Sequence, residues 1–200
     1  MRITAMMTMA ALMGASGWAG ESRTAAGPKV IVCMTLDQHP TESYQAQGIA
    51  TRMFADIGVQ VEWRTNRHSC PANGAIVIKL TEDTPHSYLP RALAFALPYE
   101  RVHIQVFYDR INKAVQPPVV PCLLAHVLVH EITHILEGID RHSETGVMKA
   151  YWSETDYVSM AWKPLAFAER DVLLIHRGLE ARAARVAAGD VPTPMTAATQ

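Results

Sequence analysis

The chain has 200 residues and a mass of 22.1 kDa, which is enough for one domain with a buried core. Hydrophobic residues make up 49% of the chain and charged residues 18%, a composition that excludes an intrinsically disordered protein. The 18 basic and 19 acidic residues leave a formal net charge of -1, so the charge signature of a nucleic-acid-binding protein is missing. We therefore expect one globular domain and no nucleic-acid partner.

Residues 1–20 have the pattern of a secretory signal peptide. Arg2 precedes an apolar run from Ile3 to Met13, and the small residues Gly17 and Ala19 suit the positions that signal peptidase reads. The apolar run is shorter than the roughly 20 residues that span a bilayer. We therefore expect export, and no membrane span once the signal peptide is removed.

The remaining chain is predicted to form one domain over residues 21–188, followed by a disordered tail over residues 189–200. Export places this domain outside the cytoplasm, either secreted or periplasmic. In an oxidising compartment Cys33, Cys70 and Cys122 permit one disulfide and leave one thiol over. The sequence does not choose the pair, and it leaves the oligomeric state open.

The first half of the domain has strand patterns and one helix pattern. A β-branched run behind a Gly-Pro pair predicts a strand over Lys29–Leu36. Apolar residues at intervals of three and four predict an amphipathic helix from near Thr41 to Ile57. Further runs of apolar or alternating residues predict strands over residues 59–64, 75–80, 92–97 and 101–108.

The second half begins with a helix that is apolar on nearly every side. This segment, Cys122–Glu137, follows Pro121, and an apolar helix of this kind is buried. Gly138 fits the left-handed position just past a helix C-terminus. We expect residues 139–163 to be irregular and a last helix to run from near Pro164 to about Val186.

Two histidines and a glutamate in the predicted buried helix form the pattern H-E-x-x-H. His130 and His134 lie one turn apart on the same helix face, so both imidazoles can reach one zinc ion at about 2.0 to 2.1 Å. Glu131 can meet a water beside the metal without binding the metal itself. Hydrogen-bonded core histidines are the alternative, but burying three polar groups without partners costs about 1 to 3 kcal/mol each. We therefore predict a zinc site.

A catalytic zinc needs a third protein ligand and an open position for water. His126 lies a further turn back along the helix, and we expect it to pack beside the site rather than to bind the metal. Three side chains that follow the helix are candidates for the third ligand: Asp140, His142 and Glu154.

These residues together resemble the long motif of the metzincin metallopeptidases. The H-E-x-x-H segment at 130–134, the helix-ending Gly138, the pair His142-Ser143 and the triplet Gly146-Val147-Met148 follow the family order of zinc helix, third ligand and Met-turn. The resemblance implies an α+β fold with a mixed, twisted sheet of about five strands. It also implies a backing helix, a central zinc-binding helix and a C-terminal helix, in the order that the patterns above predict.

The sequence departs from the family motif in the loop after the zinc helix. Gly138 is four residues after His134 and His142 is another four residues on, where the family has three and three. Asp140 therefore stands at the family spacing of the third ligand. We favour His142, because one extra residue on each side of the glycine shifts both landmarks together, and imidazole is the commoner third ligand.

The resemblance implies roles for residues outside the motif as well. Met148 forms the turn beneath the zinc as a packing residue, and the strand over residues 92–97 is the antiparallel edge strand that pairs with an extended substrate. Tyr151 and Tyr157 follow the Met-turn, but their spacing does not match the tyrosine that some metzincins use, so we expect buried or rim aromatics.

The function that we predict is an exported, zinc-dependent metallopeptidase acting on a peptide or protein substrate. Zinc held by His130, His134 and His142 activates a water, and Glu131 is the general base. The alternative is a non-catalytic metal-containing module that binds a peptide or protein on the same fold, and a purely structural zinc is a third possibility. The intact Glu131 favours the enzyme.

Overall fold

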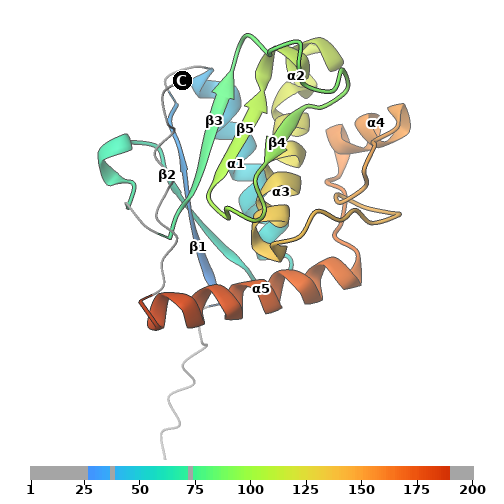
Figure 1. Ribbon diagram of the computed structural model, residues 1–200. Coiled ribbons are helices and arrows are strands. Elements are labelled where there is room, and N and C mark those ends of the chain that lie inside the picture. Colours follow the sequence, from blue (N-terminus) through green and yellow to red (C-terminus); the bar gives the residue numbers. More distant parts are fainter. Residues whose placement is uncertain (1–26, 37–38, 72–73, 190–200) are drawn as a thin grey trace, which may run out of the picture.

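A mixed five-stranded sheet organises the fold in the computed structural model, which describes residues 27–36, 39–71 and 74–189 (Figure 1). The predicted signal peptide over residues 1–20 lies outside the described residues, as does the predicted tail apart from Gly189. The predicted α+β architecture is confirmed: a backing helix, a buried central helix and a C-terminal helix accompany the mixed sheet.

The sheet has the strand order β2-β1-β3-β5-β4. Strands β2, β1, β3 and β5 run parallel to one another, and the edge strand β4 is antiparallel to β5, as the family resemblance implies. Pairing in β4 covers three residues rather than the six predicted. The strands are β1 (Lys29–Met34), β2 (Gln60–Arg64), β3 (Ile76–Thr81), β4 (Ala94–Ala96) and β5 (His103–Phe107).

Helices cover one face of the sheet and one of its ends. In Figure 1, α1 and α3 lie together behind the sheet, and α5 crosses below the lower end of α3. Val30 and Val32 of β1 are buried beneath the helices, while Ile31 between them is half-exposed on the open face. The helices are α1 (Pro40–Ala55), α2 (Tyr108–Ala114), α3 (Val120–Glu137), α4 (Glu154–Trp162) and α5 (Glu169–Ala187).

The central helix α3 is the core of the molecule. Every residue from Leu123 to Leu136 is buried, because the sheet, α1 and α5 enclose it. The segment Pro117–Glu137 is long and apolar enough to cross a membrane, but 89% of its most apolar window is buried inside the fold. Gly138 ends α3 with φ 69°, the left-handed conformation predicted for it.

The prediction of an irregular segment over residues 139–163 is wrong at its end, where α4 begins at Glu154. Ser153 caps this helix: its hydroxyl accepts a hydrogen bond from the Asp156 N–H (3.2 Å), and the Asp156 carboxylate accepts one from the Ser153 N–H (2.7 Å). This reciprocal capping satisfies two backbone donors at the helix start and fixes where the helix begins.

The start of the last helix was also predicted wrongly. α5 begins at Glu169 rather than near Pro164, because the Asp171 carboxylate accepts a hydrogen bond from the Ala168 N–H (3.1 Å). Residues 164–168 are not helical. Proline at the first helical turn is compatible with a helix, but here the capping carboxylate sets the boundary.

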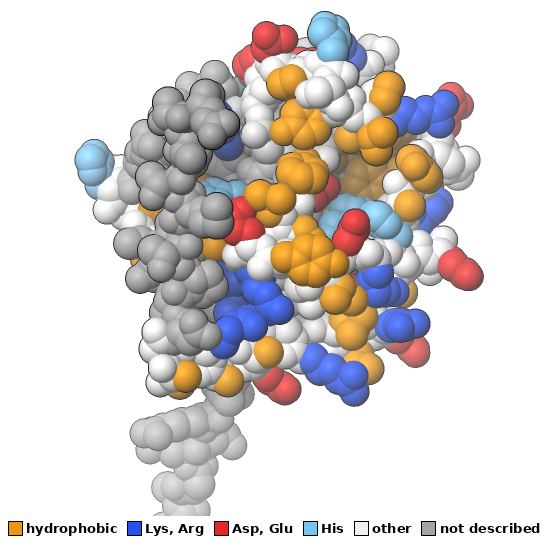
Figure 2. Space-filling view, viewed as in Figure 1, with side chains coloured by type: hydrophobic (Ala, Val, Ile, Leu, Met, Phe, Trp, Pro, Cys, Tyr) orange, Lys and Arg blue, Asp and Glu red, His pale blue; other side chains and the backbone are white. Residues whose placement is uncertain are grey.

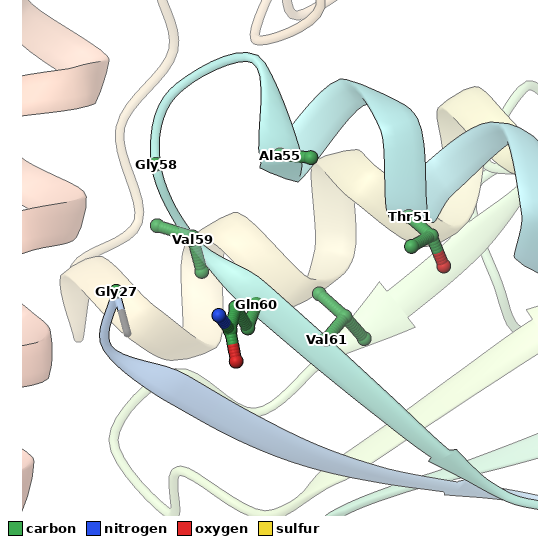
Figure 3. Close-up of a pocket in the computed structure, with 7 residues that line it drawn as sticks. All are labelled: Gly27, Thr51, Ala55, Gly58, Val59, Gln60 and Val61. Carbon is green, nitrogen blue, oxygen red and sulfur yellow. The ribbon is translucent and has the colours of Figure 1, made fainter. Parts of the chain in front are cut away.

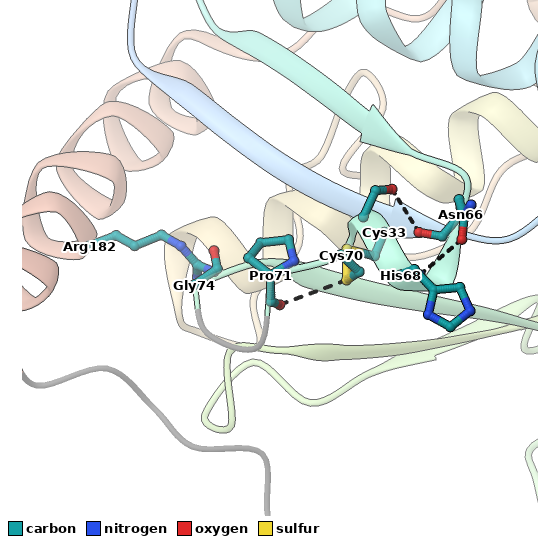
Figure 4. The surroundings of a disulfide bond; sticks show 8 residues. Cys33, Asn66, His68, Cys70, Pro71, Gly74 and Arg182 are labelled. Carbon is teal, nitrogen blue, oxygen red and sulfur yellow. Dashed lines mark hydrogen bonds between the residues drawn. A yellow bond between two sulfur atoms is a disulfide. The ribbon is translucent and has the colours of Figure 1, made fainter.

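A disulfide between Cys33 and Cys70 ties the end of β1 to the loop after β2 (Figure 4). The Cα atoms are 5.8 Å apart, and Cys122 is the free cysteine. On the way to β3, the Arg182 guanidinium of α5 donates a hydrogen bond to the Gly74 carbonyl (2.7 Å). The connection from β2 to β3 is therefore attached to the rest of the fold at two points, Cys70 and Gly74.

Candidate metal centre

Three histidines converge where α3 meets the loop that follows it. Each of His130, His134 and His142 offers one ligand atom, and these atoms lie within 4.8 Å of one another. The ring centroids are 4.7 Å apart for His130 and His134, 5.3 Å for His130 and His142, and 5.0 Å for His134 and His142. His130 and His134 are buried and His142 is exposed, so the group opens to the surface.

Backbone carbonyls fix the two buried rings. The His130 Nδ1–H donates to the Val147 carbonyl (2.9 Å), and the His134 Nδ1–H donates to the Ile139 carbonyl (3.3 Å). A carbonyl only accepts hydrogen bonds, so Nδ1 carries the proton in each neutral ring and Nε2 carries a lone pair. The two Nε2 atoms face each other at 3.0 Å.

Two nitrogen lone pairs that face each other repel, and a cation bound between them removes this repulsion. In a tetrahedral zinc site with Zn–N distances of about 2.0 to 2.1 Å, neighbouring nitrogens lie about 3.3 Å apart, close to the separation seen here. Burial, with the charge of His134, lowers the pKa of His130 to about 3, and burial lowers the pKa of His134 as well. Both rings are neutral at pH 7, as metal ligands must be, so the residues fit a zinc ion.

The turn beneath the histidines depends on a glycine. Gly146 has φ 77°, and a Cβ placed on it would lie 2.2 Å from the Ala166 carbonyl oxygen, so no other residue fits. The next N–H, that of Val147, donates to the same carbonyl (3.0 Å), and Met148 is fully buried. The turn thereby aims the Val147 carbonyl at His130.

Glu131 follows His130 directly in α3 and is only 9% exposed. Burial, together with the negative charge of Asp140, raises the pKa of Glu131 to about 8. A cation held by the neighbouring histidines lowers that pKa again, because an opposite charge favours the carboxylate. The site thus holds a carboxyl group whose protonation can change near neutral pH.

The other candidates for the third ligand are not part of the histidine group. Asp140 and Glu154 are both exposed, and in the described ranges neither belongs to a group of three or more possible ligands. Of the tyrosines, Tyr151 is 74% exposed and Tyr157 is half-buried, which agrees with rim and partly buried aromatics.

His126 has both ring nitrogens in use. Its Nδ1–H donates to the Cys122 carbonyl (2.7 Å), and its Nε2 accepts from the Leu165 N–H (3.0 Å). A nitrogen that accepts an N–H has no lone pair left for a metal, so His126 packs as expected. Sequence reasoning missed Trp152, whose ring lies edge-on to His130 at 5.5 Å; it stands in the irregular loop, where spacing carries no signal.

Figure 2 shows histidine side chains at the surface of the viewed face, with both hydrophobic and charged side chains next to them. A separate pocket of about 460 Å³ between α1 and β2 is lined by Thr51, Gln60 and small or aliphatic residues (Figure 3). That lining contains no titratable or metal-binding side chain.

The structure therefore combines a mixed sheet that has an antiparallel edge strand with a buried helix that carries H-E-x-x-H. No family model matches the sequence, and no curated protein matches it. The structure is similar to the crystal structure of archaemetzincin from Methanopyrus kandleri, with a TM-score of 0.51 and 17% sequence identity over 80% of this chain and 99% of that chain. At this identity the likeness concerns the fold alone.

Proposed function

We propose that the protein is a zinc-dependent metallopeptidase in which His130, His134 and His142 bind the metal and Glu131 is the general base. One observation carries the proposal: three imidazole ligand atoms lie within 4.8 Å of one another, and the residue that follows His130 in the same helix is a buried glutamate. A structural zinc site has four protein ligands, whereas three ligands leave a position for water.

The chain divides the chemistry between the ligands and Glu131. Zinc bound to three imidazoles supplies Lewis acidity and lowers the pKa of a coordinated water to near 7. Glu131 takes a proton from the attacking water and returns it to the leaving nitrogen of the peptide bond. Glu131 follows His130 in α3, and its burial restricts competing solvent, while the Val147 and Ile139 carbonyls hold both buried rings in one orientation.

An extended peptide or protein segment is the substrate that we propose. Among the described strands β4 pairs only with β5, so the outer edge of β4 has backbone N–H and C=O groups available to a further strand. Phe95 of β4 and Leu97 just after it are exposed and add apolar contact area. These features support hydrolysis within a chain that binds along the edge strand.

We also propose that the protein acts outside the cytoplasm. The support is the Cys33–Cys70 disulfide, because disulfides persist in oxidising compartments and are rare in the cytosol. Detection of the processed protein in the medium or the periplasmic fraction tests this proposal, and retention in the cytosol with both thiols reduced contradicts it.

Cleavage of a diverse peptide library by the purified protein tests the activity, with zinc content measured on the same preparations. Glu131→Gln should keep the metal and lose at least ~100-fold in cleavage rate, because it removes the proton acceptor but no ligand. Glu154→Gln is the matched control, an exposed glutamate outside the histidine group, and it should cleave at the normal rate. Normal cleavage by the Glu131 variant overturns the assignment.

A further inference from the structure

We propose that Asp171 of α5 is a positioning residue that holds His142 in place for the metal, acting through the two residues that flank it. The inference rests on the proposed zinc site, and concerns how the third ligand is held. His142 itself is exposed, and its ring forms no hydrogen bond with the residues that the structure describes. Whatever orders this side chain must therefore act through its neighbours.

Both neighbours bond to one buried carboxylate oxygen. Asp171 is 0% exposed, and its Oδ1 accepts hydrogen bonds from Arg141 Nη1 (2.7 Å) and from Ser143 Oγ (2.6 Å). Arg141 Nη2 also donates to Ser143 Oγ (2.8 Å), which closes a three-membered network around the backbone of His142. Charge-assisted bonds of this kind are stronger than neutral ones. We call these three residues the Asp171 anchor.

The anchor is fixed at its other end as well. Asp171 Oδ2 accepts from the Ala168 N–H (3.1 Å), so the carboxylate is part of the cap of α5 and cannot turn away. α5 in turn packs on α3 through Ile175 and Leu179, which are buried. The third ligand is thereby held in a fixed position relative to α3, the helix that carries the first two ligands.

The anchor also joins the loop to the turn beneath His130. The Ser143 N–H donates to the Met148 carbonyl (2.7 Å), and Ser143 forms an isolated β-bridge with Lys149. Arg141 reaches Glu137 at the end of α3 (3.5 Å). The loop that carries His142 is two residues longer than in the usual motif, so ordering it on metal binding would cost more conformational entropy. These hydrogen bonds order the loop before the metal binds.

Zinc affinity of Ser143→Ala and Asp171→Asn tests the anchor, with Asp109→Asn as control. Asp109 also accepts from a hydroxyl (Thr84) and pairs with a cation (Lys113), but it lies on α2. Competition with a chromophoric chelator should show that the zinc dissociation constant is 10- to 100-fold larger in both test variants and unchanged in the control. The visible absorption of the cobalt(II) protein should also weaken, since loss of the third imidazole lets water raise the coordination number.

Two results overturn the inference and are distinguishable. If the wild type binds one zinc per chain and both test variants bind it as tightly, with unchanged cobalt spectra, the anchor is structural only and the proposed function stands. If the wild type binds no zinc, the proposed function and the anchor fail together. Should Asp171→Asn not fold, Ser143→Ala decides alone, because it removes one hydroxyl and leaves the Arg141–Asp171 pair in place.

Discussion

The partners of each ring nitrogen decide what the histidines of α3 can do. His126, His130 and His134 follow one another at intervals of four residues, and all three are buried. In His130 and His134 the Nδ1–H donates a hydrogen bond to a carbonyl, so the Nε2 lone pair is available to a metal; in His126 the Nε2 lone pair accepts the Leu165 N–H. The same residue type on the same helix therefore has a ligand role at two positions and a packing role at the third.

Glu137 should make stability depend on pH. Burial raises its pKa to about 7 from the ordinary 4.5, although the charge of Arg141 opposes this. Between these values the folded protein binds more protons than the unfolded chain, so the stabilising contribution is complete below about pH 4.5 and is lost as pH rises through 7. Glu137→Gln should remove this part of the pH dependence, on the order of 1–2 kcal/mol between pH 5 and pH 8.

Urea unfolding at pH 5 and pH 8 checks the Glu137 prediction. Glu180→Gln, at an exposed position on α5, is the control and should keep the wild-type difference between the two pH values. An equal pH dependence in Glu137→Gln and the wild type contradicts the raised pKa.

At the scale of elements, the contact between α5 and α3 depends on one glycine. A Cβ placed on Gly178 would lie 1.8 Å from the Leu136 carbonyl oxygen, so the two helices cross at backbone distance. Gly178→Ala should lower the free energy of unfolding by about 1–3 kcal/mol, because α5 must move away. Gly48→Ala in α1 is the matched control: its Cβ meets only Arg52 at 3.9 Å, and it should stabilise by about 0.5–1 kcal/mol.

Chemical denaturation of both glycine variants gives the comparison. If Gly178→Ala is as stable as the wild type, the close crossing of α3 and α5 is wrong. The inference about the Asp171 anchor then loses its fixed end too, since α5 carries the carboxylate.

Helices with strong periodicity were predictable from the sequence, and short polar ones were not. α3 is apolar all round and α1 has apolar residues at intervals of three and four, so both were predicted within a few residues. α4 buries only Met160, so its sequence has almost no periodic pattern. The cap at Ser153 is the sequence feature that marks where this helix begins. α2 follows β5 without any intervening residue and has no side-chain cap, so nothing in the sequence separates it from the strand.

The candidate site divides in the same way. The interval between His130 and His134 is a property of one helix, and the sequence alone predicts that they share a face. The choice between Asp140 and His142 depends on the path of a loop, and that path is set by Asp171, about 30 residues further along the chain. Sequence spacing cannot express such a long-range bond.

At the scale of the whole molecule, α3 joins two parts of the chain. The sheet and α1 pack on one side of it, and the segment from the Met148 turn to α5 packs on the other. The polar links that cross to that second part include those from His130 to Val147, from His126 to Leu165 and from Arg141 to Asp171. The histidine group lies at this junction, so loosening of the second part should disturb the metal before it disturbs the sheet.

The disulfide should contribute to the stability of the whole fold. It links residues separated by 37 positions. Closing a loop of that length lowers the conformational entropy of the unfolded chain and so raises the free energy of unfolding by about 3–4 kcal/mol. The double variant Cys33→Ala with Cys70→Ala should therefore lose about that much unfolding free energy, measured by urea denaturation. Cys122→Ala, which removes the free thiol, should lose far less; equal losses in the two proteins contradict the bridge.

The number of zinc ions bound per chain tests the central claim most directly. The protein is dialysed against buffer without metal, and its zinc content is measured by elemental mass spectrometry. The wild type should retain one zinc per chain, and so should His86→Ala, which removes an exposed histidine outside the group. His142→Ala should retain less than about a tenth of the zinc, because two imidazoles hold the metal far more weakly than three. A wild type without zinc, or full retention in His142→Ala, contradicts the account.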